Sequence, residues 1–504
     1  MKPRRIFAAL AASLFAGLTA RGNVTLPKIL GDNMVLQRER PVAIWGTADA
    51  GDEVVVKFAG QEKRAKPDAE GHWRVALDPL KASATPQELT ITATNAAAPE
   101  KSGSVTLKNI LVGEVWFCGG QSNMEYSVNA PSSSAPSALP TDPQLARELQ
   151  TETYPQIRLF RVNKQTRAPE ISTDGWTDCN GDALNKFSAI GFFFARNLQR
   201  ALNVPVGVVG SYWGGSRLEQ WVPPAAFQKQ PAFAKEAAAP GRLLIDGRPA
   251  GDYFTSMIRD LAPFTLRGML WYQGESNIIA SNDGLRYADK LQALVDYWRG
   301  LWHDPSLPFY QVQIAPYLYT SRKDLLVDKV TPLPHAADEL PKLWEAQFLA
   351  TRLSNVEIVP TTDLDSNFKN IHPSGKRTVG QRLANLALAK VYGQKAPAWQ
   401  GPLFDKLEIK DGAAVVHFAN TGGKLATRDG QAPDDFEIAG ADGVFQPAMA
   451  VIAGDTVTLR NDAVKEPTAV RLGWTETAQP NLVNADGLPA YPFRTNGPDW
   501  KPAP

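Results

Sequence analysis

Four short apolar runs in the middle of the chain each precede a loop of glycine and polar residues, and these runs are 110–117, 205–209, 268–270 and 356–360. Between them, apolar residues recur at helical spacing, as in 187–202 and 287–301. Strand-like runs that alternate with helical patterns are typical of a parallel sheet with crossover helices. In such open sheets, ligands bind at the carboxyl ends of the strands. The pattern therefore predicts that the four loops converge on one rim.

The first of these loops contains a candidate nucleophile. Gly119 and Gly120 close the run, and Ser122 follows two positions later. Two glycines at the end of a buried strand let the chain turn sharply. A serine placed there can present its hydroxyl to a substrate and leave its own N–H free to bind an oxyanion. The alternative is a polar turn with a solvated serine, and the three further loops are what favour the nucleophile.

The four loops carry recognisable motifs in a fixed order. They read Gly-Gln-Ser-Asn-Met at 120–124, Trp-Gly-Gly-Ser at 213–216, Trp-Tyr-Gln-Gly-Glu-Ser-Asn at 271–277 and Ile-His-Pro at 371–373. With an amino-terminal block at 32–38 and a carboxyl-terminal block at 487–495, the chain resembles the sialate O-acetylesterase family of SGNH-type carbohydrate esterases. The resemblance covers nearly the whole mature chain. It implies an SGNH-like parallel sheet flanked by helices and a serine esterase that needs no cofactor and no metal.

The resemblance also assigns roles to individual residues. Ser122 is the nucleophile, and His372 is the base that activates it. The oxyanion hole is expected to consist of the N–H groups of Ser122 and Gly214 and the side-chain amide of Gln273. Gln273 stands where more typical SGNH blocks have asparagine, and Gly215 competes with Gly214 for the backbone role.

The acid that would orient the imidazole is not in its usual place. The positions two and three residues before the histidine hold Asn370 and Lys369. We expect Asp363 to take this role, with Asp365 and Glu275 as alternatives. Such an acid would hold the imidazole tautomer and stabilise the imidazolium. Two other interpretations stay open: the aspartates only cap their loop, or a main-chain carbonyl orients the ring.

Aromatic residues near the loops suggest a sugar-binding surface. Trp213 and Trp271 are the expected substrate contacts, because aromatic faces pack well against the C–H surfaces of sugars. The same residues often fill protein cores, so core packing is the alternative for each of them.

Composition and the amino terminus bear on localisation and partners. Lys2, Arg4 and Arg5 precede an apolar run, which predicts a signal peptide over residues 1–22 and a periplasmic or secreted protein. The net charge of +1 gives no indication of a nucleic-acid partner, and no membrane contact is expected after signal removal. The oligomeric state is not indicated. Cys118 and Cys179 could pair in an oxidising compartment or remain buried free thiols.

The predicted organisation has four parts: the signal peptide over 1–22, a sandwich-like β domain over 23–109, the α/β catalytic domain over 110–400 and a β-rich region over 401–504. The predicted function is an exported serine esterase that removes O-acetyl groups from sugars through an acetyl-enzyme on Ser122. The substrate would be a 9-O-acetyl sialate or an acetylated polysaccharide such as xylan. The alternative from another class is a carbohydrate-binding protein with a degenerate esterase site.

Overall fold

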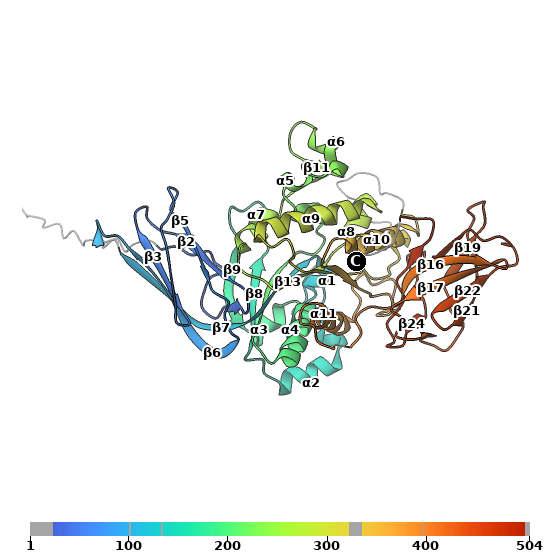
Figure 1. Cartoon of the computed structure of the whole chain (residues 1–504), viewed down its shortest axis with the longest axis horizontal. Coiled ribbons are helices and arrows are strands. Elements are labelled where there is room, and N and C mark those ends of the chain that lie inside the picture. Colours follow the sequence, from blue (N-terminus) through green and yellow to red (C-terminus); the bar gives the residue numbers. More distant parts are fainter. Residues whose placement is uncertain (1–23, 100–101, 133–134, 322–334, 396, 499–504) are drawn as a thin grey trace, which may run out of the picture.

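The computed structural model describes residues 24–99, 102–132, 135–321, 335–395 and 397–498. The molecule is elongated, with a β-rich region at each end of a central α/β body (Figure 1). The predicted signal peptide lies outside the described residues. Within the described ranges, none of the helices combines the length and the hydrophobicity needed to span a bilayer.

A row of seven strands within an 11-stranded sheet forms the middle of the body, in the order β15-β14-β13-β7-β10-β8-β9. All neighbours in this row are parallel except β8 and β9. The strands are β7 (Gly103–Gly120), β8 (Ile157–Asn163), β9 (Ser172–Asp178), β10 (Val206–Tyr212), β13 (Gly268–Tyr272), β14 (Phe309–Val312) and β15 (Val356–Val359). This sheet confirms the predicted parallel architecture, and the first three loops follow β7, β10 and β13 directly.

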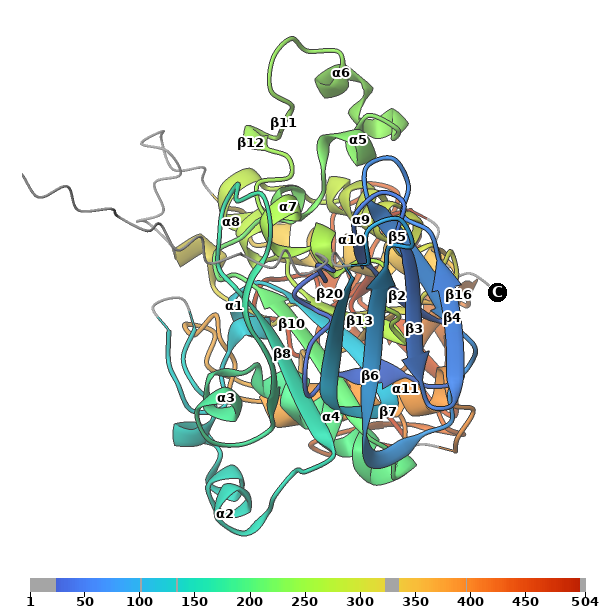
Figure 2. The ribbon, with the colours of Figure 1, turned by 90° about the vertical axis from the view of Figure 1, so that its left-hand side faces the viewer.

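Helices cover both faces of the sheet. In Figures 1 and 2, α4 and α11 lie below it and α9 and α10 lie above it. The longest are α4 (Ala189–Leu202), α9 (Arg286–Trp302), α10 (Glu339–Leu349) and α11 (Lys376–Lys390). Most of the apolar residues in α4 and α9 are buried, which explains the helical spacing in the sequence. The shorter helices are α1 (Ser122–Glu125), α2 (Pro143–Thr151), α3 (Gly181–Lys186), α7 (Phe254–Met257), α8 (Glu275–Ser281), η2 (Leu139–Thr141), η3 (Leu218–Trp221), η5 (Arg259–Leu261), η6 (Tyr319–Ser321) and η7 (Ala350–Arg352).

The amino-terminal β region shares a strand with the central sheet. Its strands are β1 (Val35–Gln37), β2 (Val42–Thr47), β3 (Glu53–Phe58), β4 (Gln61–Ala65), β5 (His72–Leu77) and β6 (Ser83–Thr94). The first part of β7 pairs with β6, whereas residues 114–120 pair with β10. The predicted boundary between 109 and 110 therefore lies inside a continuous strand. At this junction the buried Glu114 pairs with Arg38 and Arg267.

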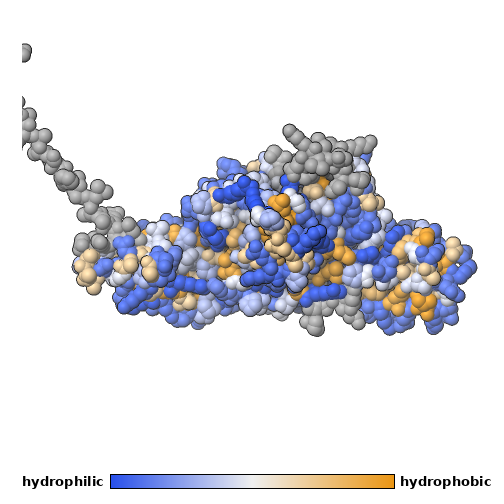
Figure 3. All heavy atoms as spheres, turned by 90° about the horizontal axis from the view of Figure 1, so that it is seen from above, coloured by the Kyte–Doolittle hydropathy of each residue, from blue (hydrophilic) through white to orange (hydrophobic). Residues whose placement is uncertain are grey.

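The carboxyl-terminal region is built of β-strands, which confirms the prediction of extra β structure at this end. Its hydrophobic core also includes Phe348 and Ile358 of the central body. Its strands are β16 (Leu403–Lys410), β17 (Ala413–Ala419), β18 (Leu425–Thr427), β19 (Phe436–Ala439), β20 (Gln446–Pro447), β21 (Met449–Ala453), β22 (Thr456–Arg460), β23 (Ala469–Leu472), β24 (Leu482–Asn484) and β25 (Phe493–Arg494). Seen from above, this end of the molecule shows a gathering of apolar side chains on a mostly hydrophilic surface (Figure 3).

Side chains of the carboxyl-terminal region hold the loop that follows β15. The amide nitrogen of Gln479 donates to the carbonyl oxygens of Thr362 and Asp365, at 2.8 Å each. The Tyr491 hydroxyl donates to the carbonyl of Ile358 in β15 at 2.7 Å. The division into domains stays a prediction, but these contacts tie the last region to the loop that leads to His372.

The chain between the second and third loops makes an excursion from the body. It contains α5 (Pro224–Phe227), η4 (Pro231–Phe233), α6 (Ala234–Ala237), β11 (Leu244–Ile245) and β12 (Arg248–Pro249). Figures 1 and 2 show it projecting above α9.

Candidate active site

The turn after β7 requires glycine. Gly120 has a φ of 138°, and a Cβ built on it would lie 2.0 Å from the carbonyl oxygen of Tyr272. Gln121 then donates its N–H to that same carbonyl at 2.9 Å, and Ser122 begins α1. The backbone therefore passes tightly against β13 and places Ser122 at the carboxyl edge of the sheet. The N–H of Ser122 lies in the first turn of a helix, where N–H groups have no intrahelical partner.

The structure brings the predicted nucleophile and base together. The Nε2 atom of His372 lies 2.8 Å from the Oγ atom of Ser122. Ser122 is buried and His372 half-buried. The side chain of Asn370 accepts from the N–H of His372 at 3.0 Å and donates to its carbonyl at 2.8 Å. This is the arrangement in which a base can take the proton of a serine hydroxyl.

Asp363 and Asp365 lie in the loop before His372 and have other partners. Both oxygens of Asp363 accept from the guanidinium of Arg382, at 2.8 and 2.6 Å. Asp365 accepts from the backbone N–H groups of Asn367 and Ser374, at 2.9 and 3.2 Å. Asp363 thus ties its loop to Arg382 in α11, and Asp365 caps the backbone of the loop that contains His372. The orienting role of either aspartate stays a prediction.

Gln273 is buried among other side chains. Its amide nitrogen lies 3.0 Å from Oε1 of Gln121 and 2.7 Å from Oδ1 of Asn277. Its own oxygen accepts from the hydroxyl of Tyr287 at 2.6 Å. The side chain therefore braces the first loop against the third, and it would have to exchange an acceptor to bind an oxyanion.

Gly214 also has a protein acceptor. Its N–H donates to Oε2 of Glu125 at 2.7 Å, and Lys164 forms an ion pair with the same buried carboxylate. Glu125 ends α1, so this contact joins the second loop to the helix that carries the serine. No sequence pattern pointed to Glu125 or Lys164, because neither lies in a motif with a known chemical role.

The two predicted sugar contacts differ in accessibility. Trp213 is half-buried and stacks on Tyr253, with ring centres 4.7 Å apart. The ammonium of Lys164 lies 5.8 Å from the centre of the Trp213 ring. Trp271 is 1% exposed and packs edge-on against Trp221 and other core rings. Trp271 thus has the core position that was its alternative, and Trp213 is the one that a sugar could reach.

A fully buried polar cluster lies behind the serine and the histidine. Asn123 donates to Oε1 of Glu275 at 2.5 Å and to the carbonyl of Ile371 at 3.0 Å. Lys376 donates to Oδ1 of Asn123 at 2.7 Å and to the carbonyl of Pro373 at 2.6 Å. Asn123 and Glu275 lie in the motifs, but no sequence signal indicates that Lys376 joins them.

Burial shifts the pKa values of Glu275 and Lys376 toward 7. It raises the pKa of Glu275 to about 7, while the hydrogen bond from Asn123 and the charge of Lys376 oppose the shift. It lowers the pKa of Lys376 to about 7, against the attraction of Glu275 and Asp365.

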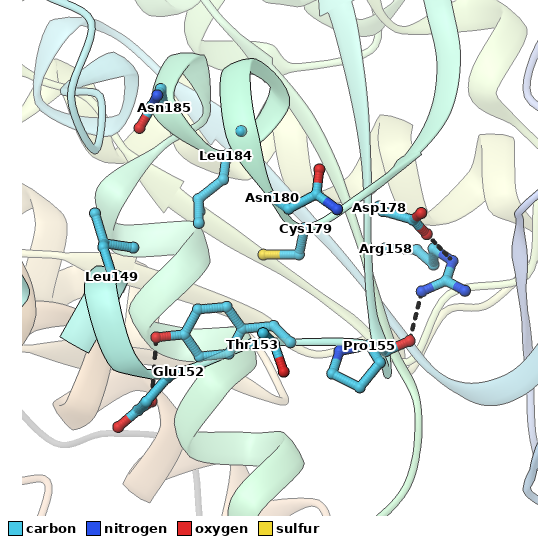
Figure 4. Close-up of a pocket in the computed structure, with 12 residues that line it drawn as sticks. Leu149, Glu152, Thr153, Pro155, Arg158, Asp178, Cys179, Asn180, Leu184 and Asn185 are labelled. Carbon is cyan, nitrogen blue, oxygen red and sulfur yellow. Dashed lines mark hydrogen bonds and ion pairs between the residues drawn. The ribbon is translucent and has the colours of Figure 1, made fainter.

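Cys118 and Cys179 are both buried free thiols. Burial raises the pKa of each thiol. Cys179 points into a pocket of about 450 Å³ between α2, β9 and α3 (Figure 4). Among the described residues, no group of three or more His, Cys, Asp or Glu side chains could hold a metal ion.

Comparison with known families decides the class of this site. A family model described as carbohydrate esterase, sialic acid-specific acetylesterase, matches residues 112–389, which is more than half of the chain. The chain belongs to this family. The match spans all four loops, and it makes the protein a carboxylic ester hydrolase, as the resemblance predicted.

Individual relatives agree with the family assignment. The chain is 30% identical over 436 residues to a sialate O-acetylesterase of Rattus norvegicus, with 75% of each chain covered. It is 29% identical over 434 residues to that of Homo sapiens, covering 79% of this chain and 76% of the relative. A crystal structure of a carbohydrate acetylesterase from Xanthomonas citri superposes with a TM-score of 0.77 and 32% identity, covering 94% of this chain and 100% of that one. The predicted fold class is thus confirmed.

Proposed function

We propose that this protein is an exported serine esterase that removes O-acetyl groups from acetylated sugars through an acetyl-enzyme on Ser122. The observation that carries the proposal is the 2.8 Å contact between Nε2 of His372 and Oγ of Ser122. It occurs at the carboxyl edge of a parallel sheet, where such folds bind ligands. Membership of a carbohydrate esterase family supports the substrate class.

Acylation begins when Ser122 Oγ attacks the acetyl carbonyl carbon and His372 Nε2 accepts the hydroxyl proton. The tetrahedral intermediate collapses as the bond to the sugar oxygen breaks, and His372 returns the proton to that oxygen. In deacylation, a water molecule gives a proton to His372 and attacks the acetyl-enzyme. Acetate then leaves, and the proton returns to Ser122 Oγ.

The negative oxygen of the intermediate needs nearby donors. The N–H of Ser122 is the first, because it lies at the start of α1 beside the reacting hydroxyl. The N–H of Gly214 and the amide of Gln273 are the further proposed donors. The Gly214 N–H now donates to Glu125, and the Gln273 amide nitrogen lies within hydrogen-bonding distance of Gln121, Ser216 and Asn277. Each donor would turn to the oxyanion as it forms. Catalytic hydrogen bonds often tighten only when substrate is bound.

The preferred sugar is proposed to be an O-acetylated sialic acid, which the names of the curated relatives favour. Trp213, stacked on Tyr253 beside Lys164, would be the platform for the sugar ring. Acetylated xylan is the competing substrate to include. Released acetate from 9-O-acetyl sialate and from acetylated xylan, compared at equal acetyl concentration, decides between them.

A serine-directed phosphonate tests the mechanism itself. We expect it to label Ser122 covalently, and to label neither Ser122→Ala nor heat-unfolded protein. A carbohydrate-binding protein with a degenerate site would bind acetylated sugars but would neither react with the phosphonate nor release acetate. Absence of labelling in folded wild-type protein would therefore replace the esterase by the binding function.

Export is the remaining part of the proposal and rests on the sequence of residues 1–22. Amino-terminal sequencing of protein recovered from the periplasm or the medium is expected to begin close to residue 23. Recovery of the intact amino terminus in the cytoplasm would contradict export.

A further inference from the structure

The backbone on either side of the catalytic base is held by two buried side chains. The carbonyl of Ile371, before His372, accepts from the amide of Asn123 at 3.0 Å. The carbonyl of Pro373, after it, accepts from the ammonium of Lys376 at 2.6 Å. These two donors are themselves joined by a hydrogen bond of 2.7 Å. Asn123 and Lys376 thus form one hydrogen-bonded unit that holds the backbone on both sides of His372. We call residues 360–375, between β15 and α11, the histidine loop.

Asn123 also connects these hydrogen bonds to the nucleophile. It follows Ser122 directly in the short helix α1, so the same turn of backbone carries the serine and the side chain that holds the histidine loop. Movement of Asn123 relative to Ile371 would change the separation between Ser122 Oγ and the imidazole. Glu275 lies on the other side of Asn123, and its Oε1 accepts from the amide nitrogen at 2.5 Å.

The surroundings of this unit are closed. Asn123 and Lys376 are 0% exposed, and Glu275 is 1% exposed. The ammonium of Lys376 faces the rings of Tyr126 and Tyr272, at 4.5 and 5.8 Å from their centres. Burying a lysine and a glutamate costs free energy, and replacing such groups by apolar ones is often neutral or stabilising. A contribution to stability is therefore a weak explanation for these buried groups. Their hydrogen bonds to the backbone around His372 offer a more specific explanation.

We propose that Asn123, Lys376 and Glu275 are positioning residues that hold His372 in hydrogen-bonding distance of Ser122. None of them needs to touch the substrate. Asn123 and Lys376 fix the two carbonyls that flank the base, and Glu275 fixes the amide of Asn123. This inference rests on the proposed roles of Ser122 and His372, and it accounts for a buried cluster that the chemical steps do not use.

The test compares turnover per active serine in variants of this unit. Lys376→Met and Asn123→Leu remove the donors to the loop and replace them with apolar side chains of similar length and branching. Because a displacement of about 1 Å can cost about 100-fold in rate, we expect kcat to fall roughly 10- to 100-fold. The KM for a chromogenic acetate ester should change less than about threefold, because the substrate contacts remain. Each kcat is divided by the fraction of molecules that the phosphonate titrates.

Two substitutions of Glu275 separate geometry from charge. Glu275→Gln keeps an oxygen that can accept from Asn123, so it should retain kcat within about threefold of wild type. Glu275→Leu has no acceptor and should lose about tenfold. Glu114→Gln is the matched control, because Glu114 is buried to the same degree in β7 but lies roughly 20 Å along the strand from Gly120. It is expected to lower thermal stability and to leave kcat per titrated site unchanged.

The outcomes are distinct. If Lys376→Met and Asn123→Leu melt at lower temperature but keep wild-type kcat per titrated site, the unit is only structural and the inference is wrong. If they fail to fold, Asn123→Asp decides, because it keeps the acceptor for Lys376 and loses the donor to Ile371. A wild-type kcat for that variant overturns the inference, and a tenfold loss supports it. Failure of wild-type protein to react with the phosphonate would overturn the proposed function first, and this inference with it.

Discussion

At the scale of single residues, the site is defined by one hydrogen bond between groups that are 250 positions apart in the sequence. Ser122 depends on Gly120 for its approach to the sheet edge, and His372 depends on Asn370 for the conformation of its backbone. In the proposed mechanism, the Ser122 hydroxyl reacts only weakly unless His372 takes its proton, so the two residues act together.

The first prediction concerns this interdependence. Ser122→Ala and His372→Ala are each expected to lower kcat for acetate release by several orders of magnitude, and the double variant should be little worse than either single one. Steady-state kinetics on a chromogenic acetate ester measure all three, and circular dichroism checks that they fold. Losses that multiply in the double variant would show that His372 does not act on Ser122.

The second prediction concerns Asp363. Its carboxylate is bidentate on Arg382, which is 6% exposed, so Asp363→Asn leaves a buried guanidinium without its counter-charge. We expect a loss of about 1–3 kcal/mol in the free energy of unfolding, measured by urea denaturation. Asp365→Asn is the comparison and should lose less, because Asp365 accepts from backbone N–H groups and not from a buried guanidinium. If Asp363→Asn instead keeps its stability but loses most of its kcat per titrated site, Asp363 is the residue that orients the His372 ring.

Much of this site could be predicted from sequence, for a physical reason. Glycine and polar residues after apolar runs are local signals, and parallel strands collect such signals at one edge, so the contact between Ser122 and His372 was predictable. Lys376 was not, because a lysine three residues after the histidine is indistinguishable from a surface lysine at a helix start. Trp271 was ambiguous for a similar reason, since aromatic residues suit both sugars and cores.

At the scale of elements, three helices begin at the polar cluster. Glu275 is the first residue of α8 and Lys376 the first of α11, while Asn123 is the second of α1. Helix amino termini favour negative charge and disfavour positive charge. The helix dipole therefore favours a negative charge on Glu275. It disfavours the positive charge of Lys376, which is offset by its hydrogen-bond acceptors and by the nearby carboxylates.

A third prediction concerns the turn between β7 and α1. Gly120→Ala would force a Cβ to within 2.0 Å of a backbone oxygen at a φ of 138°. We expect a loss of about 3 kcal/mol or more in the free energy of unfolding, together with loss of phosphonate labelling. Gly300→Ala in α9 is the matched control, because a Cβ there meets nothing within 4 Å and should gain about 0.5–1 kcal/mol. Wild-type labelling of Gly120→Ala would show that the turn tolerates a side chain.

A fourth prediction follows from the buried pair of Glu275 and Lys376. The pKa of Glu275 rises from 4.5 to about 7, so the folded protein retains a proton that the unfolded chain releases, and stability falls as the pH rises through that window. The pKa of Lys376 falls from 10.5 to about 7, so the unfolded chain holds the extra proton, and stability rises with pH above 7. Tyr272 and Tyr287 also face Glu275, and Asp365 faces Lys376.

The double variant Glu275→Gln/Lys376→Met removes both titrations. Relative to wild type, it should therefore gain most stability near pH 7 and less near pH 5 and pH 9, with a slope of at most about 1.4 kcal/mol per pH unit for each group. Urea denaturation at the three pH values measures the difference. A difference that is flat across this range would mean that neither group titrates with the shifted pKa.

At the scale of the whole molecule, the two β regions are continuous with the catalytic body in different ways. The amino-terminal region is joined through β7, whose far end carries the nucleophile turn. The carboxyl-terminal region is joined through side chains that hold the loop between β15 and His372. The sequence indicated the β character of both ends, but strand pairing across a predicted boundary depends on contacts that no local pattern shows.

The fifth prediction tests whether the carboxyl-terminal region supports catalysis. Gln479 donates to two backbone carbonyls of the histidine loop, so Gln479→Leu leaves both acceptors without this donor at nearly constant volume. We expect faster amide hydrogen exchange across residues 361–375 and a three- to tenfold lower kcat per titrated site, with the carboxyl-terminal β region still folded. Arg471→Met removes an ion pair with Glu437 inside the carboxyl-terminal sheets and is the matched control. If the two variants have the same rates of amide hydrogen exchange and the same kcat per titrated site, Gln479 does not support the histidine loop. The carboxyl-terminal region would then have no role in catalysis through this contact.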